Sequence, residues 1–211
     1  MHPSFQLGYI TDRKSLHCSS LESFLCETIR AGVDLIQIRE KDLGTRELIS
    51  LAEQAVSCAS GSASRIVVND RLDVARSVGA AGVHLGHHSM PTRAVRAIVP
   101  HGFLIGVSCH SLEDAVAAES EGADYILFGP VFETPSKLPY GPPLGLQKLQ
   151  EVTARVKAPV LALGGITLER VKPCLEAGAR GIAGIRIFQD ASSLPELITE
   201  LRAHFELAQR P

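Results

Sequence analysis

The sequence has 211 residues, a formal net charge of −2 and 45% hydrophobic residues. A chain of this size and composition can bury a sizeable core, and one domain over residues 1–211 is the simplest division. Because the charge is close to neutral, no global field favours nucleic acid or a membrane surface, so any anion site must be local. No apolar run approaches the ~20 residues of a membrane span.

The chain has five cysteines, Cys18, Cys26, Cys58, Cys109 and Cys174. Their number is odd and no two have CxxC spacing, which argues against a disulfide framework or a thiolate zinc site and predicts free thiols. The first residues lack the basic and apolar regions of a signal peptide. We therefore expect a soluble cytoplasmic protein.

Strand and helix signals alternate along the whole chain. Short apolar runs predict strands at 5–10, 33–38, 66–68, 82–85, 103–107, 125–128, 160–163 and 181–185. Helical spacing predicts helices at about 16–31, 46–59, 72–79, 92–99, 112–121, 146–155, 168–177 and 193–208. The strands are mostly apolar without alternation, as in a parallel sheet that is buried on both faces. The pattern predicts the α/β class and a single (β/α)8 TIM barrel, with an open doubly wound sheet as the alternative.

In such a barrel the active site lies at the carboxyl ends of the strands. The second predicted strand runs into Gln37, Arg39 and Lys41, which share one face if the strand continues. An amide and two cations side by side indicate an anionic guest, phosphate or diphosphate. The alternative is a strand that ends in a solvated loop, with both cations paired to Glu40 and Asp42.

The next two strand ends carry candidate metal ligands. Asn69 and Asp70 offer an amide and a carboxylate, which suit Mg²⁺, although either side chain is also suited to capping the helix that begins near Leu72. His87 and His88 follow the fourth strand. Zinc is not expected there, because neighbouring side chains on an extended chain point apart and no third ligand is evident.

Polar side chains also follow the fifth and sixth strands. Ser108 is suited to hydrogen-bonding a substrate, and His110 is suited either to acid–base chemistry or to a structural role. The long loop after the sixth strand supplies Thr134, Ser136 and Lys137, as expected of a lid or an anion-binding loop.

The last two strand ends predict a phosphate site. Gly165 follows the seventh strand, and Ile185 and Arg186 follow the eighth. Glycine at these turns allows backbone N–H groups to approach a phosphate closely, and Arg186 adds a positive charge.

The motifs in order are Gln-x-Arg-x-Lys, Asn-Asp-Arg, Gly-Val-His-Leu-Gly, Gly-Val-Ser-x-His, Gly-Pro-Val-Phe-x-Thr-x-x-Lys and Gly-Gly-Ile. Together they resemble the thiamine phosphate synthase family over nearly the whole chain. The resemblance implies a transferase of thiamine biosynthesis, which joins 4-amino-2-methyl-5-hydroxymethylpyrimidine diphosphate to a thiazole phosphate and releases diphosphate, with Mg²⁺ as cofactor. It implies small-molecule substrates, no nucleic-acid or membrane partner, and a homodimer as the assembly to consider.

The resemblance also implies roles for individual residues. Gln37, Arg39, Lys41 and Asn69 would bind the pyrimidine diphosphate, Asp70 would bind Mg²⁺, and Ser108 and Lys137 would serve the diphosphate. The thiazole phosphate would be bound by Thr134 and Ser136 with the backbone at Gly165, Ile185 and Arg186. Arg39, Lys41, Ser108 and Lys137 would act in catalysis by stabilising the leaving group, and His110 remains a candidate for substrate binding.

Two residues depart from the family pattern. Ser89 stands where the synthases usually have a second aspartate ligand for Mg²⁺, and Arg186 stands where they often have serine. Both changes favour the related thiazole tautomerases, but Pro130 occupies the position of a histidine that can transfer protons in that branch, so His110 would have to replace it. A third hypothesis is a non-catalytic barrel that binds thiazole or thiamine phosphate.

Overall fold

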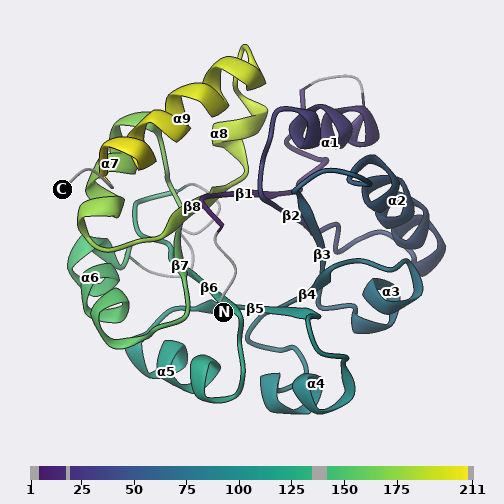
Figure 1. The fold of residues 1–211 in the computed structure, drawn as a ribbon, viewed down its shortest axis with the longest axis horizontal. Helices are drawn as coiled ribbons and strands as arrows, with labels where there is room; N and C mark the ends of the chain where they lie inside the picture. Colours follow the sequence, from purple (N-terminus) through teal and green to yellow (C-terminus); the bar gives the residue numbers. More distant parts are fainter. Residues whose placement is uncertain (1–4, 18–19, 135–141, 209–211) are drawn as a thin grey trace.

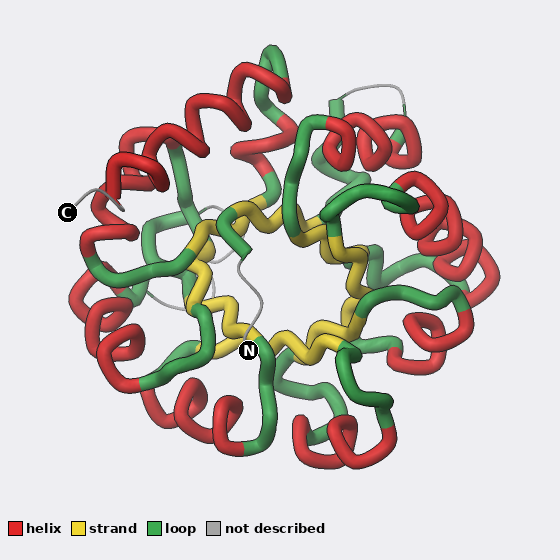
Figure 2. Tube along the Cα trace, viewed as in Figure 1, coloured by secondary structure: helices red, strands yellow, loops and turns green. Residues whose placement is uncertain are grey.

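The computed structural model describes residues 5–17, 20–134 and 142–208. Eight parallel strands form a closed barrel, in which each strand pairs with the next in sequence and the last pairs with the first. Figure 2 shows the strands as an inner ring surrounded by helices. The predicted (β/α)8 barrel is confirmed. The open sheet is wrong, because it would leave two unpaired edge strands.

The strands are β1 (Leu7–Ile10), β2 (Leu35–Ile38), β3 (Arg65–Asn69), β4 (Gly82–Leu85), β5 (Leu104–Cys109), β6 (Tyr125–Phe128), β7 (Val160–Leu163) and β8 (Gly181–Gly184). The helices are α1 (Leu21–Arg30), α2 (Thr45–Cys58), α3 (Leu72–Ser77), α4 (Thr92–Ile98), α5 (Leu112–Ser120), α6 (Gly145–Arg155), α7 (Leu168–Glu176), α8 (Arg186–Gln189) and α9 (Leu194–Ala208). Figure 1 shows their order around the barrel. No helix in the described part of the chain is long and apolar enough to span a lipid bilayer.

The sequence predicted these elements closely, with two exceptions. Helix α1 begins at Leu21 rather than near residue 16, because the Ser20 side chain caps it by accepting a hydrogen bond from the Ser23 N–H at 3.2 Å. The short helix α8, directly after β8, was not predicted. It begins two residues after the end of β8, close to where a phosphate site was expected.

Side chains fill both faces of the strands. One core cluster lies between the strands and the surrounding helices, as expected for a parallel sheet covered by helices. A second, smaller cluster consists of Phe5, Ile10, Leu35, Val67, Tyr125, Leu127, Leu161 and Ala183. Burial of each large apolar side chain contributes roughly 1.5–3 kcal/mol. The barrel is therefore a packed core, and ligands must bind at its ends.

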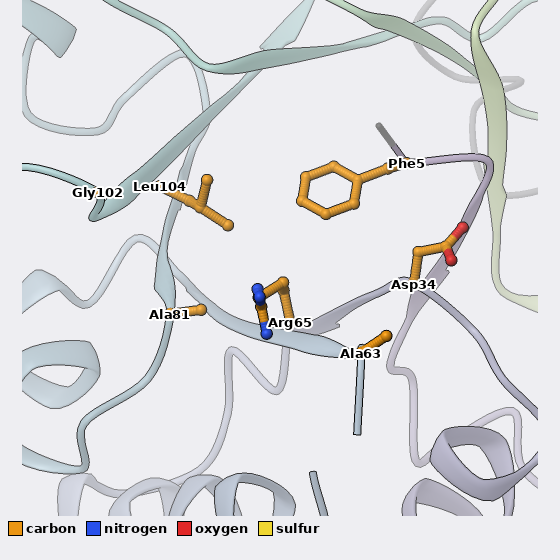
Figure 3. Close-up of a pocket in the computed structure, with 7 residues that line it drawn as sticks. All are labelled: Phe5, Asp34, Ala63, Arg65, Ala81, Gly102 and Leu104. Atoms are coloured by element: carbon orange, nitrogen blue, oxygen red, sulfur yellow. The ribbon is translucent and has the colours of Figure 1, made fainter. Parts of the chain in front are cut away.

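The pocket in Figure 3 lies at the amino-terminal end of the barrel. It is lined by Phe5, Asp34, Ala63, Arg65, Ala81, Gly102 and Leu104, which begin or precede the first five strands. None of these residues was predicted to belong to the functional site. Asp34 in its wall has a structural role, since it accepts the N–H of Leu7 at 2.9 Å and pairs with Arg202 of α9 at 2.6 Å.

A disulfide bond links Cys26 on α1 to Cys58 on α2, with the two Cα atoms 5.5 Å apart. The prediction of free thiols is wrong for this pair. It is correct for Cys109 and Cys174, which are buried and unbonded, while Cys18 lies outside the described residues. Cysteine spacing did not reveal the bond, because it depends on two consecutive helices packing side by side outside the barrel.

We expect the disulfide to stabilise the barrel. It closes a loop over a sequence separation of 32 residues, so reduction should lower the free energy of unfolding by about 3–4 kcal/mol. In a chain of this size the melting temperature should fall by about 10 °C. Thermal unfolding with and without a reductant measures this shift. The double variant Cys26→Ala/Cys58→Ala is the control and should not respond to the reductant; an equal response in both proteins would contradict the prediction.

Candidate active site

Gln37 and Asn69 meet at the carboxyl end of the barrel. Gln37 Nε2 donates a hydrogen bond to Asn69 Oδ1 at 2.9 Å, and only 3% of the Gln37 surface is exposed. Gln37 Oε1 is buried and has no hydrogen-bond partner among the described residues. A buried acceptor without a partner costs about 1–3 kcal/mol, so Oε1 is suited to accept a hydrogen bond from a ligand.

The two predicted cations come directly after this glutamine. Strand β2 ends at Ile38, so the expected strand face reaches Gln37 but does not continue to Lys41. The backbone N–H of Arg39 donates to Thr11 Oγ1 at 2.8 Å, which fixes the chain as it leaves the strand, and Lys41 is exposed in the following turn. The structure therefore places Arg39 and Lys41 at the barrel mouth on a loop.

The neighbouring carboxylates are bound by the loop after β1. Arg13 Nη1 contacts Glu40 Oε2 at 3.1 Å and Asp42 Oδ1 at 2.6 Å, and Lys14 Nζ contacts Asp42 Oδ2 at 2.8 Å. Hydrogen bonds from Arg13 and Lys14 hold the pKa of Asp42 well below its usual range. The alternative is therefore correct in that the strand ends in a loop with Lys41 exposed, and wrong in pairing the two cations with Glu40 and Asp42. Arg39 makes no ion pair with any described carboxylate.

Asp70 is held in an unusual backbone conformation. It has φ of 64°, the only positive φ among the described residues other than glycine, and its N–H donates to the His84 carbonyl at 2.8 Å. The left-handed region costs about 1–2 kcal/mol for most residues and less for Asp and Asn, and residues held there are concentrated at functional sites. Asp70 does not cap α3, whose N-cap is Arg71 with no side-chain hydrogen bond, and its side chain is exposed.

The loop after β4 offers no second carboxylate. Ser89 Oγ accepts the Gly86 N–H at 2.7 Å and so closes the turn. His87 and His88 are exposed, with their rings in edge contact. In the described ranges 5–17, 20–134 and 142–208, no group of three His, Cys, Asp or Glu side chains could hold a metal ion. A cation at this mouth would therefore need oxygen ligands other than clustered carboxylates of these residues.

Ser108 lies within β5 and is held by a buried histidine. His84 Nε2 is 2.8 Å from Ser108 Oγ, and His84 Nδ1 is 3.1 Å from the Tyr125 hydroxyl. His84 is 1% exposed, and burial, followed by the positive charge of Arg39, lowers its pKa to about 3. Sequence reasoning missed His84 and Tyr125. The only signal was a histidine inside the apolar strand motif Gly-Val-His-Leu-Gly.

His110 has a structural contact. Its Nδ1 donates a hydrogen bond to the Gly129 carbonyl oxygen, and its backbone N–H donates to Asp114 Oδ2 at 3.2 Å. The residue itself is exposed. The first bond connects the end of β5 to the chain that leaves β6, and the second connects it to α5. They match the structural role that the sequence left open, and a role of His110 in substrate binding stays a prediction.

The loop after β6 is described only in part. Thr134 is half-buried, while the predicted ligands Ser136 and Lys137 lie outside the described residues. Just before this gap, Phe132 stacks against Arg170, whose guanidinium carbon is 4.7 Å from the ring centroid. Arg170 Nη1 also donates to the Gly165 carbonyl at 2.6 Å. Arg170, which the sequence analysis did not single out, thus joins the loop to the turn after β7.

The turn after β7 requires glycine. Gly164 and Gly165 have φ of 95° and 64°. A Cβ atom at Gly165 would lie 2.5 Å from the Glu133 carbonyl oxygen, so any side chain there would displace the loop after β6. At the neighbouring strand end, Ile185 precedes α8 and Arg186 begins it, with Arg186 Nε 3.1 Å from Asp190 Oδ2. Glycine backbone and Arg186 thus lie at the carboxyl ends of β7 and β8, and their binding of a phosphate stays a prediction.

The fold and this mouth define a (β/α)8 barrel enzyme whose strand ends are suited to an anionic small molecule. The family model for thiamine monophosphate synthase matches residues 7–188. The chain is 47% identical over 154 residues to the thiamine-phosphate synthase of Methanoculleus marisnigri, covering 73% of each chain. It is 36% identical over 185 residues to that of Clostridium novyi, covering 88% of this chain and 91% of the relative.

A solved structure from the same family is similar over nearly the whole chain. Thiamine phosphate pyrophosphorylase from Pyrococcus furiosus superposes with a TM-score of 0.87 at 34% identity and covers 98% of both chains. The chain belongs to the thiamine monophosphate synthase family. The family and the class of enzyme that the sequence motifs predicted are therefore confirmed.

We expect Arg13 to keep the anion site positive by binding the neighbouring carboxylates, although Arg13 itself was not predicted to bind the ligand. In Arg13→Gln, Glu40 and Asp42 lose their main partner and offset the positive charge of Arg39 and Lys41, so the Kd for inorganic diphosphate should rise about three- to tenfold at low salt. Calorimetric titration measures this change. Arg76→Gln on α3 is the control, because it removes the same charge without releasing these carboxylates. Equal effects of both variants would contradict the prediction.

Proposed function

We propose that the chain is a thiamine-phosphate synthase, which condenses 4-amino-2-methyl-5-hydroxymethylpyrimidine diphosphate with a thiazole phosphate to give thiamine phosphate and diphosphate. The observation that carries the proposal is the barrel mouth itself. A buried, unmatched acceptor at Gln37 lies beside Arg39, whose neighbouring carboxylates are bound elsewhere. This combination suits a ligand with a hydrogen-bond donor at one end and a diphosphate at the other.

The pyrimidine would bind at Gln37. Its 4-amino group is a donor, and Gln37 Oε1 is the acceptor that lacks a partner in the described structure. Asn69 keeps the Gln37 amide in place through the 2.9 Å hydrogen bond from Nε2. Binding the amino group would remove the desolvation penalty of Oε1, which makes this contact more favourable than a new hydrogen bond at an exposed position.

The diphosphate would then face Arg39, Lys41, Ser108 and Lys137. In the reaction the C–O bond between the pyrimidine methylene and the diphosphate breaks, and its electron pair leaves with the diphosphate. The electron-rich aminopyrimidine stabilises the cation that forms, and the lone pair of the thiazole nitrogen makes the new C–N bond. No protein nucleophile is needed. The protein's contribution is to stabilise negative charge on the leaving group with fixed cations and donors.

We propose Mg²⁺ as the cofactor, held by Asp70 and by oxygens of the substrate diphosphate. The donor set fits in part, since Asp70 gives one hard anionic oxygen at the mouth, while Ser89 is neutral and its Oγ already accepts the Gly86 N–H. When bound, the ion supplies further charge stabilisation of the leaving group. Asp70 would bind it, Ser89 would be at most a weak ligand, and Arg39 and Lys41 would add positive charge.

The thiazole phosphate would bind at the opposite strand ends. Thr134 and Ser136 would donate from the loop after β6, and Gly165, Ile185 and Arg186 would offer backbone N–H groups at the turns after β7 and β8. Gly164 and Gly165 both have positive φ, and the tight turn that they form at the end of β7 supports this placement, because turns of this kind can present backbone N–H groups to an anion. Arg186 would contact the phosphate after leaving Asp190, an exposed pair that contributes little on its own.

We further propose that the enzyme works in the cytoplasm, alone or as a homodimer, on small-molecule substrates and without a nucleic-acid or membrane partner. The biosynthetic reaction supports the cytoplasm. Disulfide bonds also occur in intracellular proteins of hyperthermophiles, so the bond between Cys26 and Cys58 is compatible with this location. The tautomerase alternative gains no support from the residue at the expected proton-transfer position, since Pro130 cannot transfer a proton.

The first test is release of diphosphate from the two substrates. Wild-type protein should release diphosphate only with Mg²⁺, and Asp70→Asn should lower kcat/KM at least about tenfold because it removes the anionic oxygen. Asparagine tolerates positive φ, so its melting temperature should stay within a few degrees of wild type. Asp70→Ala is the matched variant that should lose activity and also about 1 kcal/mol of stability. No release by wild-type protein, with the thiazole phosphate still bound, would sink the proposal.

The second test addresses the pyrimidine. Gln37→Met fills nearly the same volume but removes the buried acceptor, so KM for the pyrimidine diphosphate should rise about tenfold, the equivalent of one hydrogen bond. The Kd for inorganic diphosphate, which has no amino group, should be unchanged. The melting temperature should change little, because removal of the unmatched acceptor offsets the loss of the Nε2 hydrogen bond to Asn69. A similar loss of affinity for both ligands would contradict the assignment.

A further inference from the structure

We propose that a buried hydrogen-bond chain from Tyr125 through His84 to Ser108 fixes the Ser108 hydroxyl as a donor to the bound diphosphate. Tyr125 and His84 are then positioning residues of the reaction, although neither contacts the ligand. This inference rests on the proposed function for the identity of the anion. The chain itself is a property of the barrel interior.

Three neighbouring strands build the chain. His84 on β4 and Tyr125 on β6 both occupy the level of Gly106 on the strand between them. A Cβ atom at Gly106 would lie 2.0 Å from Tyr125 Cζ and 2.2 Å from its hydroxyl oxygen. The missing side chain on β5 therefore provides the space in which the tyrosine ring crosses to reach His84 Nδ1 at 3.1 Å. Ser108, further along the same strand, meets His84 Nε2 at 2.8 Å.

Burial decides which nitrogen of His84 carries the proton. The Tyr125 residue is 0% exposed, and in the described part of the chain its hydroxyl bonds only to His84 Nδ1. If Nδ1 were protonated, it would donate to Tyr125 and leave the phenol hydrogen buried without an acceptor. The favourable arrangement is Tyr125 O–H donating to Nδ1. Burial raises the pKa of Tyr125 and lowers that of His84 to about 3, so both groups stay neutral.

The proton on Nε2 then determines whether the Ser108 hydroxyl accepts a hydrogen bond from His84 or donates one to it. Nε2–H donates to Ser108 Oγ, which uses one lone pair of the serine and leaves its own hydrogen free. Ser108 is partly exposed, so this hydrogen can be donated to an anion at the mouth. In the opposite tautomer Ser108 would donate to His84 and turn its lone pairs toward the diphosphate. Tyr125 thus fixes the Ser108 hydroxyl as a donor to the anion without contacting the ligand.

The tautomer of His84 can be measured directly. In protein labelled with ¹⁵N-histidine, the ring nitrogen shifts and their couplings to the ring protons distinguish the two neutral forms. Wild-type protein without ligand should show His84 with its proton on Nε2, and Tyr125→Phe should populate the form with the proton on Nδ1. A wild-type spectrum with the proton on Nδ1 would overturn the proposal, and this measurement needs no variant to fold.

Binding of inorganic diphosphate in the presence of Mg²⁺ provides the second readout. Ser108→Ala and Tyr125→Phe should each raise Kd about five- to tenfold, and the double variant should be no weaker than Ser108→Ala alone, because both changes remove the same donated hydrogen. Tyr9→Phe is the matched control. Tyr9 is also a buried tyrosine, but it packs against Phe24 and Phe188 outside the barrel and accepts from Gln189 Nε2 at 2.9 Å.

Any effect of Tyr9→Phe should simply add to that of Ser108→Ala, as expected of a structural change. Additive behaviour of Tyr125→Phe as well would overturn the proposal. His84→Gln, which retains an N–H donor near the Nε2 position, should restore more diphosphate affinity than His84→Leu. The binding cycle does not require turnover. Coupling between Tyr125 and Ser108 without synthase activity would therefore support this inference while rejecting the proposed function.

Discussion

The guanidinium of Arg13, on the loop after β1, binds both carboxylates of the loop after β2. Glu40 is 5% exposed, and its oxygens accept both the Arg13 side chain and the Arg13 backbone N–H. In a chain with a net charge of −2, a positive site exists only if nearby carboxylates are directed away from it. Arg13 does this from a neighbouring strand end. The positive character of the mouth thus depends on a residue that need not touch the ligand.

A row of inward-facing polar side chains lies beneath this charged rim. Gln37, Asn69, His84 and Ser108 come from four consecutive strands, and Tyr125 from the next. Each polar group inside the barrel must be matched, because the interior offers no water in exchange. His84 is matched on both ring nitrogens, whereas Gln37 Oε1 is not matched by any described residue. The hydrogen bonds of this row are thus complete at His84. One acceptor, Gln37 Oε1, is left over at the point where a substrate amino group would bind.

Much of this organisation was predictable from the sequence. Apolar runs without alternation indicated a parallel sheet, and the closed barrel placed the strand ends together, so Gln37, Asn69 and Asp70 could be identified as neighbours. Arg13 could not be identified, because it lies 27 residues from Glu40 and nothing in the local pattern links them. The disulfide was missed for the same reason. His84 was missed because a histidine within an apolar strand has the same sequence pattern whether it is functional or structural.

The change to Ser89 alters how charge must be supplied at the mouth. A site with two carboxylates neutralises a divalent ion largely by itself, whereas Asp70 contributes one negative charge and Ser89 none. Under the proposed function the remaining charge comes from the diphosphate, so the ion and the substrate stabilise each other and bind together. Asp70 then gains importance, and its backbone has φ of 64°, a conformation that Asp tolerates better than most residues. Under the proposed function this conformation places the single carboxylate at the mouth, where the anion arrives.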